Sequence, residues 1–148
     1  MAQSLANILL HIVFSTKDRQ PTIVAGAADE LHRYLAGVCR ELGCPAHQVG
    51  GTQDHVHMAC SLARTVTLSK LVEDVKTSSS KWMKTKGSRS FAWQNGYGAF
   101  SFGQSQLDEV KRYIANQESH HRRRTFQEEF RLLLERYRVP YDDRYVWD

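Results

Sequence analysis

Two histidines separated by a single residue form the pair of side chains with the clearest chemical meaning in this sequence. They stand in the run Asp-His-Val-His-Met at positions 54–58, which has the pattern of a β-strand. Side chains two positions apart on a strand share a face, so His55 and His57 can present both imidazoles to one metal ion while Val56 points into the core. A histidine-triad nucleotide hydrolase would need a third histidine two positions on, where the chain has Ala59. The pattern is compatible with a metal site, but on its own it is more often an idle histidine pair on an exposed sheet face.

A second polar group lies in a segment with helical periodicity. Tyr113 and Gln117 are four residues apart and share a helix face, and Gln117 and His121 repeat that spacing. On the same helix Val110 and Ile114 are expected to face the sheet. A tyrosine hydroxyl has an ordinary pKa of about 10, so a metal or a base must help it ionise before it can act as a nucleophile. A buried structural tyrosine is the default interpretation of any single tyrosine, but a polar patch of Tyr, Gln and His beside a basic cluster is less easily explained as core.

Positive charge is concentrated in two parts of the chain. The net charge is +4, yet there is no acidic residue between Asp74 and Asp108. That stretch contains six aromatic residues, Trp82, Phe91, Trp93, Tyr97, Phe100 and Phe102. Cations interleaved with aromatic rings are typical of nucleic-acid binding, since phosphates pair with the charges and bases stack on the rings. The candidate DNA-binding residues are Lys76, Lys81, Lys84, Arg89, Arg122, Arg123 and Arg124.

The periodicity predicts the elements that must position these groups. Strands are expected at 7–16, 46–53, 55–62, 91–93 and 99–102, and helices at 25–42, 68–84, 105–120 and 125–137. Thr67 is the expected cap of the second helix, and a capping box from Ser105 to Asp108 is expected to start the third. The order of the first elements predicts an α+β fold of the ferredoxin-like split βαβ type. We expect an antiparallel sheet with helices on one face, plus C-terminal helices that carry the tyrosine.

Length and composition fit one compact domain spanning residues 1–148. Apolar residues make up 41% and charged residues 24% of the 148. No apolar run approaches the roughly 18–20 residues that span a bilayer, and no secretion signal is evident, so we expect no membrane association. Three cysteines without a Cys-x-x-Cys pair indicate reduced thiols and a cytoplasmic protein. A zinc site of Cys39, Cys44 and His47 is a weaker alternative.

Four short motifs, taken in order, resemble a known family. They are Phe14-Ser15-Thr16-Lys17, Asp54-His55-Val56-His57, Ser78-Ser79-Ser80-Lys81-Trp82 and Tyr113-Ile114-Ala115-Asn116-Gln117. Together they resemble the single-tyrosine HUH transposases, which form the insertion-sequence-200-like family with chromosomal relatives associated with repeated palindromes. The segments 93–101 and 141–147 are similar to the family too, so the resemblance covers nearly the whole chain.

The resemblance implies a DNA transposase that cleaves and rejoins single-stranded DNA and recognises hairpins. Tyr113 corresponds to the nucleophile, which attacks a DNA phosphate to leave a 5′-phosphotyrosine and a free 3′-hydroxyl. His55, His57 and Gln117 correspond to the protein ligands of a divalent ion, Mg²⁺ or Mn²⁺. His121 is near enough in sequence to compete with Gln117 as a ligand.

The resemblance also implies a homodimer with composite active sites, in which the tyrosine helix of one subunit serves the histidine pair of the other. Gly98 and Gly103 precede this helix and offer hinges. The sheet edge, or aromatic residues near Phe100 and Phe102, would supply the contact.

Two other functions compete with this interpretation. A non-catalytic binder of single-stranded or hairpin DNA would keep the fold without turnover. An RNA-recognition sheet is less favoured, because its central strands display aromatics where this chain has histidines.

Overall fold

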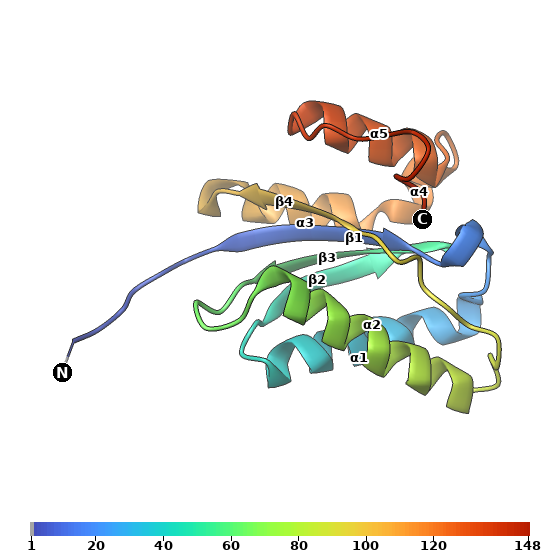
Figure 1. Cartoon of the computed structure of the whole chain (residues 1–148), viewed down its shortest axis with the longest axis horizontal. Helices are drawn as coiled ribbons and strands as arrows, with labels where there is room; N and C mark the ends of the chain where they lie inside the picture. Colours follow the sequence, from blue (N-terminus) through green and yellow to red (C-terminus); the bar gives the residue numbers. More distant parts are fainter. Residues whose placement is uncertain (1) are drawn as a thin grey trace.

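The computed structural model describes residues 2–148 and consists of a sheet held between two layers of helices (Figure 1). The strands are β1 (Leu9–Ser15), β2 (Ala46–Gly51), β3 (His55–Ser61) and β4 (Gly98–Phe102). The α-helices are α1 (Ala25–Glu41), α2 (Leu68–Thr85), α3 (Leu107–Ala115), α4 (Gln117–His121) and α5 (Phe126–Arg136). Two short 3₁₀ turns, η1 (Lys17–Arg19) and η2 (Gln104–Gln106), complete the order.

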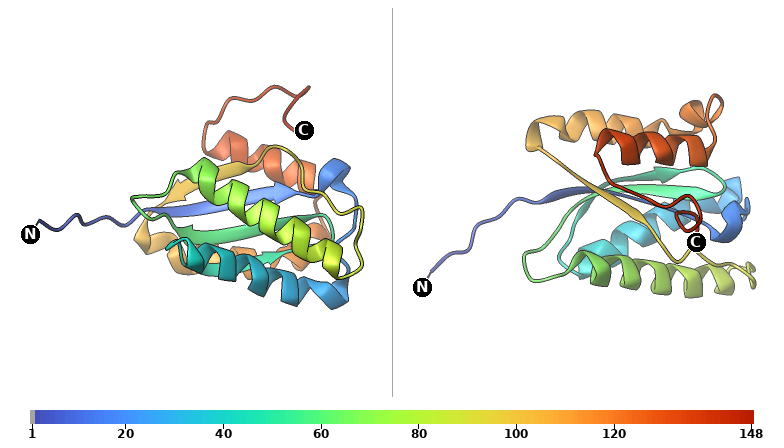
Figure 2. Two further views of the ribbon diagram at one scale, coloured as in Figure 1. Left: turned by 60° about the horizontal axis from the view of Figure 1, so that its bottom comes forward. Right: turned by 45° about the horizontal axis from the view of Figure 1, so that its top comes forward.

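The sheet has the order β2-β3-β1-β4, and each neighbouring pair is antiparallel. With one helix between β1 and β2 and another between β3 and β4, this is the split βαβ arrangement, so the predicted α+β fold is confirmed. The α1 and α2 helices cover one face, and α3, α4 and α5 lie on the other (Figures 1 and 2). Both faces of the two central strands are therefore covered.

The β1 strand supplies side chains to both layers, as its alternating pattern predicted. Leu10, Ile12 and Phe14 enter the main core, where they pack with side chains of α1 and α2. Val13 enters a second core on the opposite face. Every residue of the strand is buried. A strand covered on both faces is expected to be apolar throughout, and the exceptions, among them His11, therefore need a polar partner.

The second core fixes α5 over β1 and β4. It contains Val13 and Phe100 from the sheet together with Phe126, Phe130, Leu133 and Leu134 from α5. The helix begins at a capping box, in which the Thr125 side chain accepts a hydrogen bond from the Glu128 backbone and Glu128 reaches back to Thr125. The cap and the apolar face together determine which side of α5 meets the sheet.

A glycine allows α3 to approach the sheet closely. A Cβ atom at Gly50 of β2 would overlap the backbone carbonyl of Ile114 and lie 3.1 Å from its Cγ2. Ile114 is fully buried in this contact, next to Tyr113 in sequence. The absence of a side chain at Gly50 thus sets the height of the tyrosine helix above the sheet.

Three expectations about local structure were wrong: the strand at 91–93, the continuous helix at 105–120 and the capping box that starts at Ser105. Residues 91–93 form no ladder strand: Trp93 makes an isolated bridge with Thr16, and its indole N–H donates to Ser79 Oγ at 2.9 Å. This segment is held by its aromatic side chains, since Phe91 and Trp93 pack edge to face.

The expected helix 105–120 is interrupted. Asn116, with φ −102° and ψ 24°, leaves the helical region and separates α3 from α4. At the start, the Gly103 N–H donates to Gln106 Oε1 at 3.0 Å, and no Ser105 cap forms. After the break, the side chains of Gln117 and His121 contact His55 of β3.

The cysteines do not form a zinc site among residues 2–148. Cys39, Cys44 and Cys60 are buried free thiols, and His47 hydrogen-bonds with Ser61 Oγ at 2.8 Å. Burial raises the pKa of the Cys39 thiol to about 12, as expected for an unreactive core cysteine. No helix in the described part of the chain is both long and apolar enough to cross a membrane.

Candidate active site

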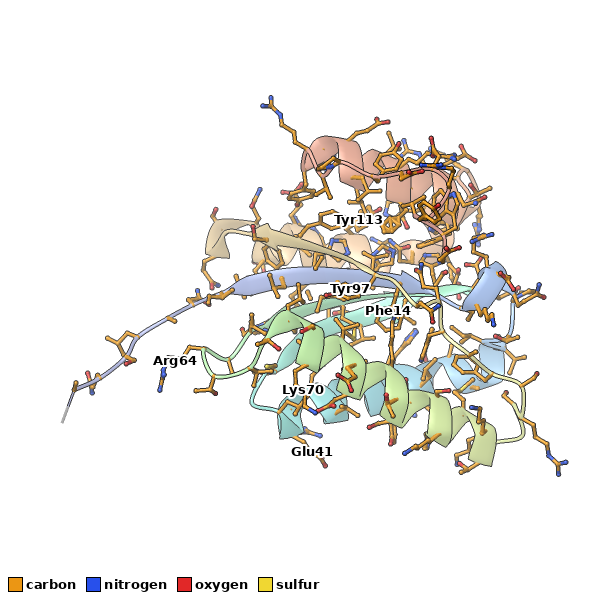
Figure 3. The ribbon with its side chains drawn as sticks, in the orientation of Figure 1. Phe14, Glu41, Arg64, Lys70, Tyr97 and Tyr113 are labelled. Atoms are coloured by element: carbon orange, nitrogen blue, oxygen red, sulfur yellow. The ribbon has the colours of Figure 1, made fainter. Side chains whose placement is uncertain are left out.

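The residues predicted to do chemistry come together on the face covered by α3, α4 and α5. His55 Nε2 lies 3.0 Å from Gln117 Oε1, so β3 and α4 meet there. The rings of His57 and Tyr113 are 5.8 Å apart between centroids. Figure 3 shows Tyr113 above the sheet, beneath α5 and on the side opposite Lys70 and Glu41. One compact site thus contains His55, His57, Tyr113 and Gln117.

Asp54 orients the first histidine. Its Oδ1 accepts hydrogen bonds from His55 Nδ1 at 2.7 Å and from Thr52 Oγ1 at 3.1 Å. Burial alone would raise the pKa of Asp54, but the hydrogen bond and charge of His55 outweigh it and the pKa is lowered. The carboxylate thereby orients the His55 ring so that Nε2 faces the site, as second partners of metal-binding histidines do.

His57 is held on its other side by a histidine that the sequence did not single out. His11 Nε2 and His57 Nδ1 hydrogen-bond at 2.7 Å between β1 and β3. Burial lowers the pKa of His57 to about 4 and that of His11 to about 3. Both rings are therefore neutral at physiological pH, and a neutral imidazole is the form that binds a metal.

Glu129 lies at the centre of the site and was missed by sequence reasoning. It is 3% exposed on α5, and its Oε1 accepts from His57 Nε2 at 2.9 Å and from His121 Nε2 at 3.0 Å. Burial alone would raise the pKa of Glu129, but the hydrogen bonds from His121 and His57 outweigh it, and the pKa falls well below its usual range. A signal was present in the sequence, because Glu129 interrupts the apolar face formed by Phe126, Phe130 and Leu133.

Tyr113 hydrogen-bonds through its hydroxyl to the other oxygen of this carboxylate, Glu129 Oε2. The same oxygen accepts from Gln117 Nε2 at 3.2 Å. Burial raises the pKa of Tyr113, and the neighbouring Glu129 charge raises it further. In the protein without an ion or DNA the hydroxyl is therefore protonated.

The donor set fits a divalent cation. One nitrogen each of His55, His57 and His121 and one oxygen of Glu129 all lie within 4.8 Å of one another. The shorter separations, 2.9 Å for His57–Glu129 and 3.0 Å for His121–Glu129, match the roughly 3 Å between adjacent ligands of an octahedral ion bound at about 2.1 Å.

The contact between His55 Nε2 and Gln117 Oε1, at 3.0 Å, brings an imidazole nitrogen and an amide oxygen to the same point of the site. Both kinds of atom can serve as ligands of a divalent cation. Imidazole, amide and carboxylate donors together suit Mn²⁺, or Mg²⁺ completed by water and phosphate.

The predicted DNA-binding residues separate into two groups. Arg122, Arg123 and Arg124 line a cleft of about 760 Å³ beside Asp54 and His121, and they also line a second cleft that contains Tyr113. Lys76, Lys81 and Lys84 line a groove along α2 with Trp93 and Tyr97. Arg89 is exposed in the turn after α2. Only the arginine cluster adjoins the candidate site.

Lys76 has a structural role within the α2 groove. Its ammonium group donates to the carbonyls of Gln94, Asn95 and Gly96 at 2.5–3.2 Å and lies 5.1 Å from the centre of the Phe14 ring. These contacts hold the loop that leads into β4. They leave Lys76 less available to a phosphate than Lys81 and Lys84, which are exposed.

Solved structures share this fold. A candidate transposase from Deinococcus radiodurans matches with a TM-score of 0.64 and 19% identity, over 79% of this chain and 98% of that one. The structure of a REP-associated tyrosine transposase bound to a REP hairpin matches with a TM-score of 0.60 and 12% identity, over 82% of this chain and 74% of that one. At these identities the likeness establishes the fold. No curated protein sequence matches the chain significantly.

The fold is thus that of structures described as transposases, and the sequence gives the family. Residues 4–117 match the family described as "Transposase IS200 like". This match covers more than half of the chain and includes His55, His57, Tyr113 and Gln117. The chain belongs to the IS200-like transposase family, in agreement with the resemblance found in its motifs.

Proposed function

We propose that this transposase cleaves and rejoins single-stranded DNA through a covalent bond to Tyr113. The observation that best supports the proposal is the juxtaposition of Tyr113 with the histidine pair, to which it is joined through Glu129. The nucleophile and the candidate metal ligands are therefore neighbours in one small site, although they come from β3, α3, α4 and α5.

In the proposed reaction the Tyr113 hydroxyl oxygen attacks a DNA phosphorus atom. A bond forms between this oxygen and phosphorus, and the bond from phosphorus to the 3′-oxygen breaks. The hydroxyl proton leaves the tyrosine, and the 3′-oxygen takes up a proton as it departs. The phosphotyrosine retains the energy of the broken bond, so a 3′-hydroxyl can later reverse the step and rejoin strands without a nucleotide cofactor.

We assign the divalent ion to His55, His57 and Gln117, with His121 as the alternative to Gln117. When bound, Mg²⁺ or Mn²⁺ would offset the charge that builds on the non-bridging phosphate oxygens. Asp54 would hold the imidazole of His55 in its orientation, and His11 would do the same for the imidazole of His57.

The DNA strand is proposed to enter past the arginine cluster. Arg122–Arg124 line both clefts beside the site, where they can neutralise backbone phosphates. The fold neighbour solved with a REP hairpin supports hairpin DNA as the substrate class. The groove that contains Lys81 and Lys84 lies on the opposite layer of the fold and would serve DNA beyond the cleavage point.

The proposed function is tested with single-stranded DNA that carries candidate hairpins. With Mg²⁺ present, a fraction of the protein is expected to shift on a denaturing gel to the mass of a protein–DNA adduct, while blunt duplex of the same sequence gives none. EDTA is expected to abolish the shift. Hairpin binding without any adduct would instead indicate the non-catalytic binder.

We further propose that the protein works as a homodimer. Strand β4 is an edge of the sheet and is open to pairing with a second copy. Phe100 does not supply the contact expected from the sequence, because it is 3% exposed and stacks on Tyr137 beneath α5. In the described chain Tyr113 lies against its own histidine pair, and a composite site would require α3 to exchange between subunits.

Complementation distinguishes the two arrangements of the dimer. His57→Ala and Tyr113→Phe proteins are each expected to be inactive alone. If the sites are composite, mixing them with subunit exchange gives heterodimers that contain one intact site, with about a quarter of wild-type cleavage. If each chain uses its own tyrosine, no activity returns even when exchange is demonstrated with tagged subunits.

A further inference from the structure

Glu129 makes two kinds of contact, one with each oxygen of its carboxylate. Oε1 faces the imidazoles of His57 and His121, at 2.9 and 3.0 Å. Oε2 faces the Tyr113 hydroxyl and the Gln117 amide nitrogen. The carboxylate thus hydrogen-bonds both to candidate metal ligands and to the hydroxyl of the candidate nucleophile.

The surroundings of Glu129 are arranged for an ionised carboxylate. The group is almost fully buried, and a buried carboxylate without compensation would be costly. Four hydrogen-bond donors from three other elements converge on its two oxygens, so the charge is kept in an otherwise apolar helix face. Stability alone does not account for such an arrangement, because replacing the whole buried polar cluster by apolar residues would avoid its desolvation cost.

We propose that Glu129 is a bridging residue, in which Oε1 is a ligand of the divalent ion and Oε2 holds the Tyr113 hydroxyl beside it. This inference rests on the proposed function, since it assumes the metal site and the nucleophile. It adds a carboxylate to a set of nitrogen and amide donors, and carboxylate oxygen is the ligand type that Mg²⁺ and Mn²⁺ prefer.

With this role for Glu129, α5 supplies one residue of the metal site. Residues 118–148 lie outside the segment that matches the family, yet α5 supplies the buried carboxylate through the packing of Phe126 and Phe130. Ion binding is therefore expected to stabilise the packing of α5 against β3, because His57 and Glu129 would bind the same ion.

The ligand role is tested by titrating Mn²⁺ alone and following the free-ion signal by electron paramagnetic resonance. Glu129→Gln keeps the size of the side chain and removes its charge, and it is expected to weaken Mn²⁺ binding at least about 10-fold. Glu135→Gln makes the same change at an exposed position of α5 and should bind as wild type. His57→Ala reports on the metal site itself and should lose specific binding.

These variants distinguish a failure of the Glu129 proposal from a failure of the proposed metal site. Loss of binding in His57→Ala with wild-type affinity in Glu129→Gln would overturn the role of Glu129 and leave the metal site intact. Wild-type affinity in His57→Ala would overturn the metal site of the proposed function. If Glu129→Gln fails to fold by circular dichroism, Glu129→Asp serves instead. It withdraws the carboxylate by one methylene and is also expected to bind Mn²⁺ more weakly, so wild-type affinity there would contradict the proposal.

The positioning role is tested by fluorine NMR on protein labelled with 3-fluorotyrosine. The Tyr113 resonance is identified by its absence in Tyr113→Phe, and saturating Mn²⁺ should broaden it strongly in the wild type because the hydroxyl is held beside the ion. In Glu129→Leu, which has no polar atom to hold the hydroxyl, broadening at saturating Mn²⁺ should be clearly weaker. Equal broadening in the two proteins would show that Tyr113 is placed without Glu129.

Discussion

Replacement of Tyr113 by phenylalanine is expected to abolish the covalent protein–DNA adduct and to reduce strand cleavage by about 10³-fold or more. The change removes a single oxygen atom, the one that would form the bond to phosphorus. The ring keeps its packing against His57 and His120, so the fold and DNA affinity should be nearly unchanged. Cleavage is measured on a labelled hairpin substrate, and affinity by fluorescence anisotropy.

Tyr137→Phe is the matched control for this variant. Tyr137 follows α5 and stacks on Phe100, with ring centroids 4.8 Å apart, and its ring rather than its hydroxyl makes the contact. It should cleave as wild type. An adduct that persists in Tyr113→Phe would show that another residue is the nucleophile, whatever the geometry around Tyr113.

Loss of one histidine of the pair is expected to have the second large effect. His57→Ala should lower metal-dependent cleavage at least about 100-fold, because it removes an ion ligand and leaves Glu129 and His11 without their shared partner. His55→Ala should behave alike. Gln117→Ala should cost less, because His121 Nε2 lies 3.1 Å from the Gln117 oxygen and can take its place.

His47→Ala is the control, since His47 lies on the neighbouring strand β2 and is hydrogen-bonded to Ser61 outside the site. Each variant is checked by thermal unfolding, because His57 is completely buried. Wild-type cleavage in both His55→Ala and His57→Ala would mean that the histidine pair has only a structural role.

The parts of the fold that follow from local periodicity could be predicted from the sequence. The alternation of β1 and the helical spacing of α1 and α2 predicted the order of elements. The alternation of β3 predicted that Val56 points into the main core. Residues 91–93 were misjudged because aromatic residues suit both strands and buried loops. Here the indole hydrogen bond of Trp93 to Ser79 holds the chain where a strand was expected.

The site could be predicted where its residues are close in sequence. His55 and His57 share a strand, and Gln117 lies one helical turn after Tyr113, although a break at Asn116 separates the two helices. Glu129 and His11 reach the site only through tertiary packing, from α5 and β1. Glu129 interrupts the apolar face of α5, but the sequence does not indicate which residues it or His11 meets, and only the folded chain brings them to the site.

The contacts of Glu129 also bear on the extent of the domain. We propose that residues 118–148 belong to the same domain as the segment that matches the family, because α5 contributes to the second core and to the site. A chain that ends after α4 would lack Glu129 and would expose Val13 and Phe100.

The most direct test of the central claim is mass spectrometry of the adduct formed by the wild-type protein. After incubation with a hairpin substrate and Mg²⁺, the protein is digested with protease and nuclease and its peptides are sequenced. We predict a nucleotide attached through its 5′-phosphate to Tyr113, with a free 3′-hydroxyl on the released strand. A nucleotide attached to any other residue, or through its 3′-phosphate, would contradict the account.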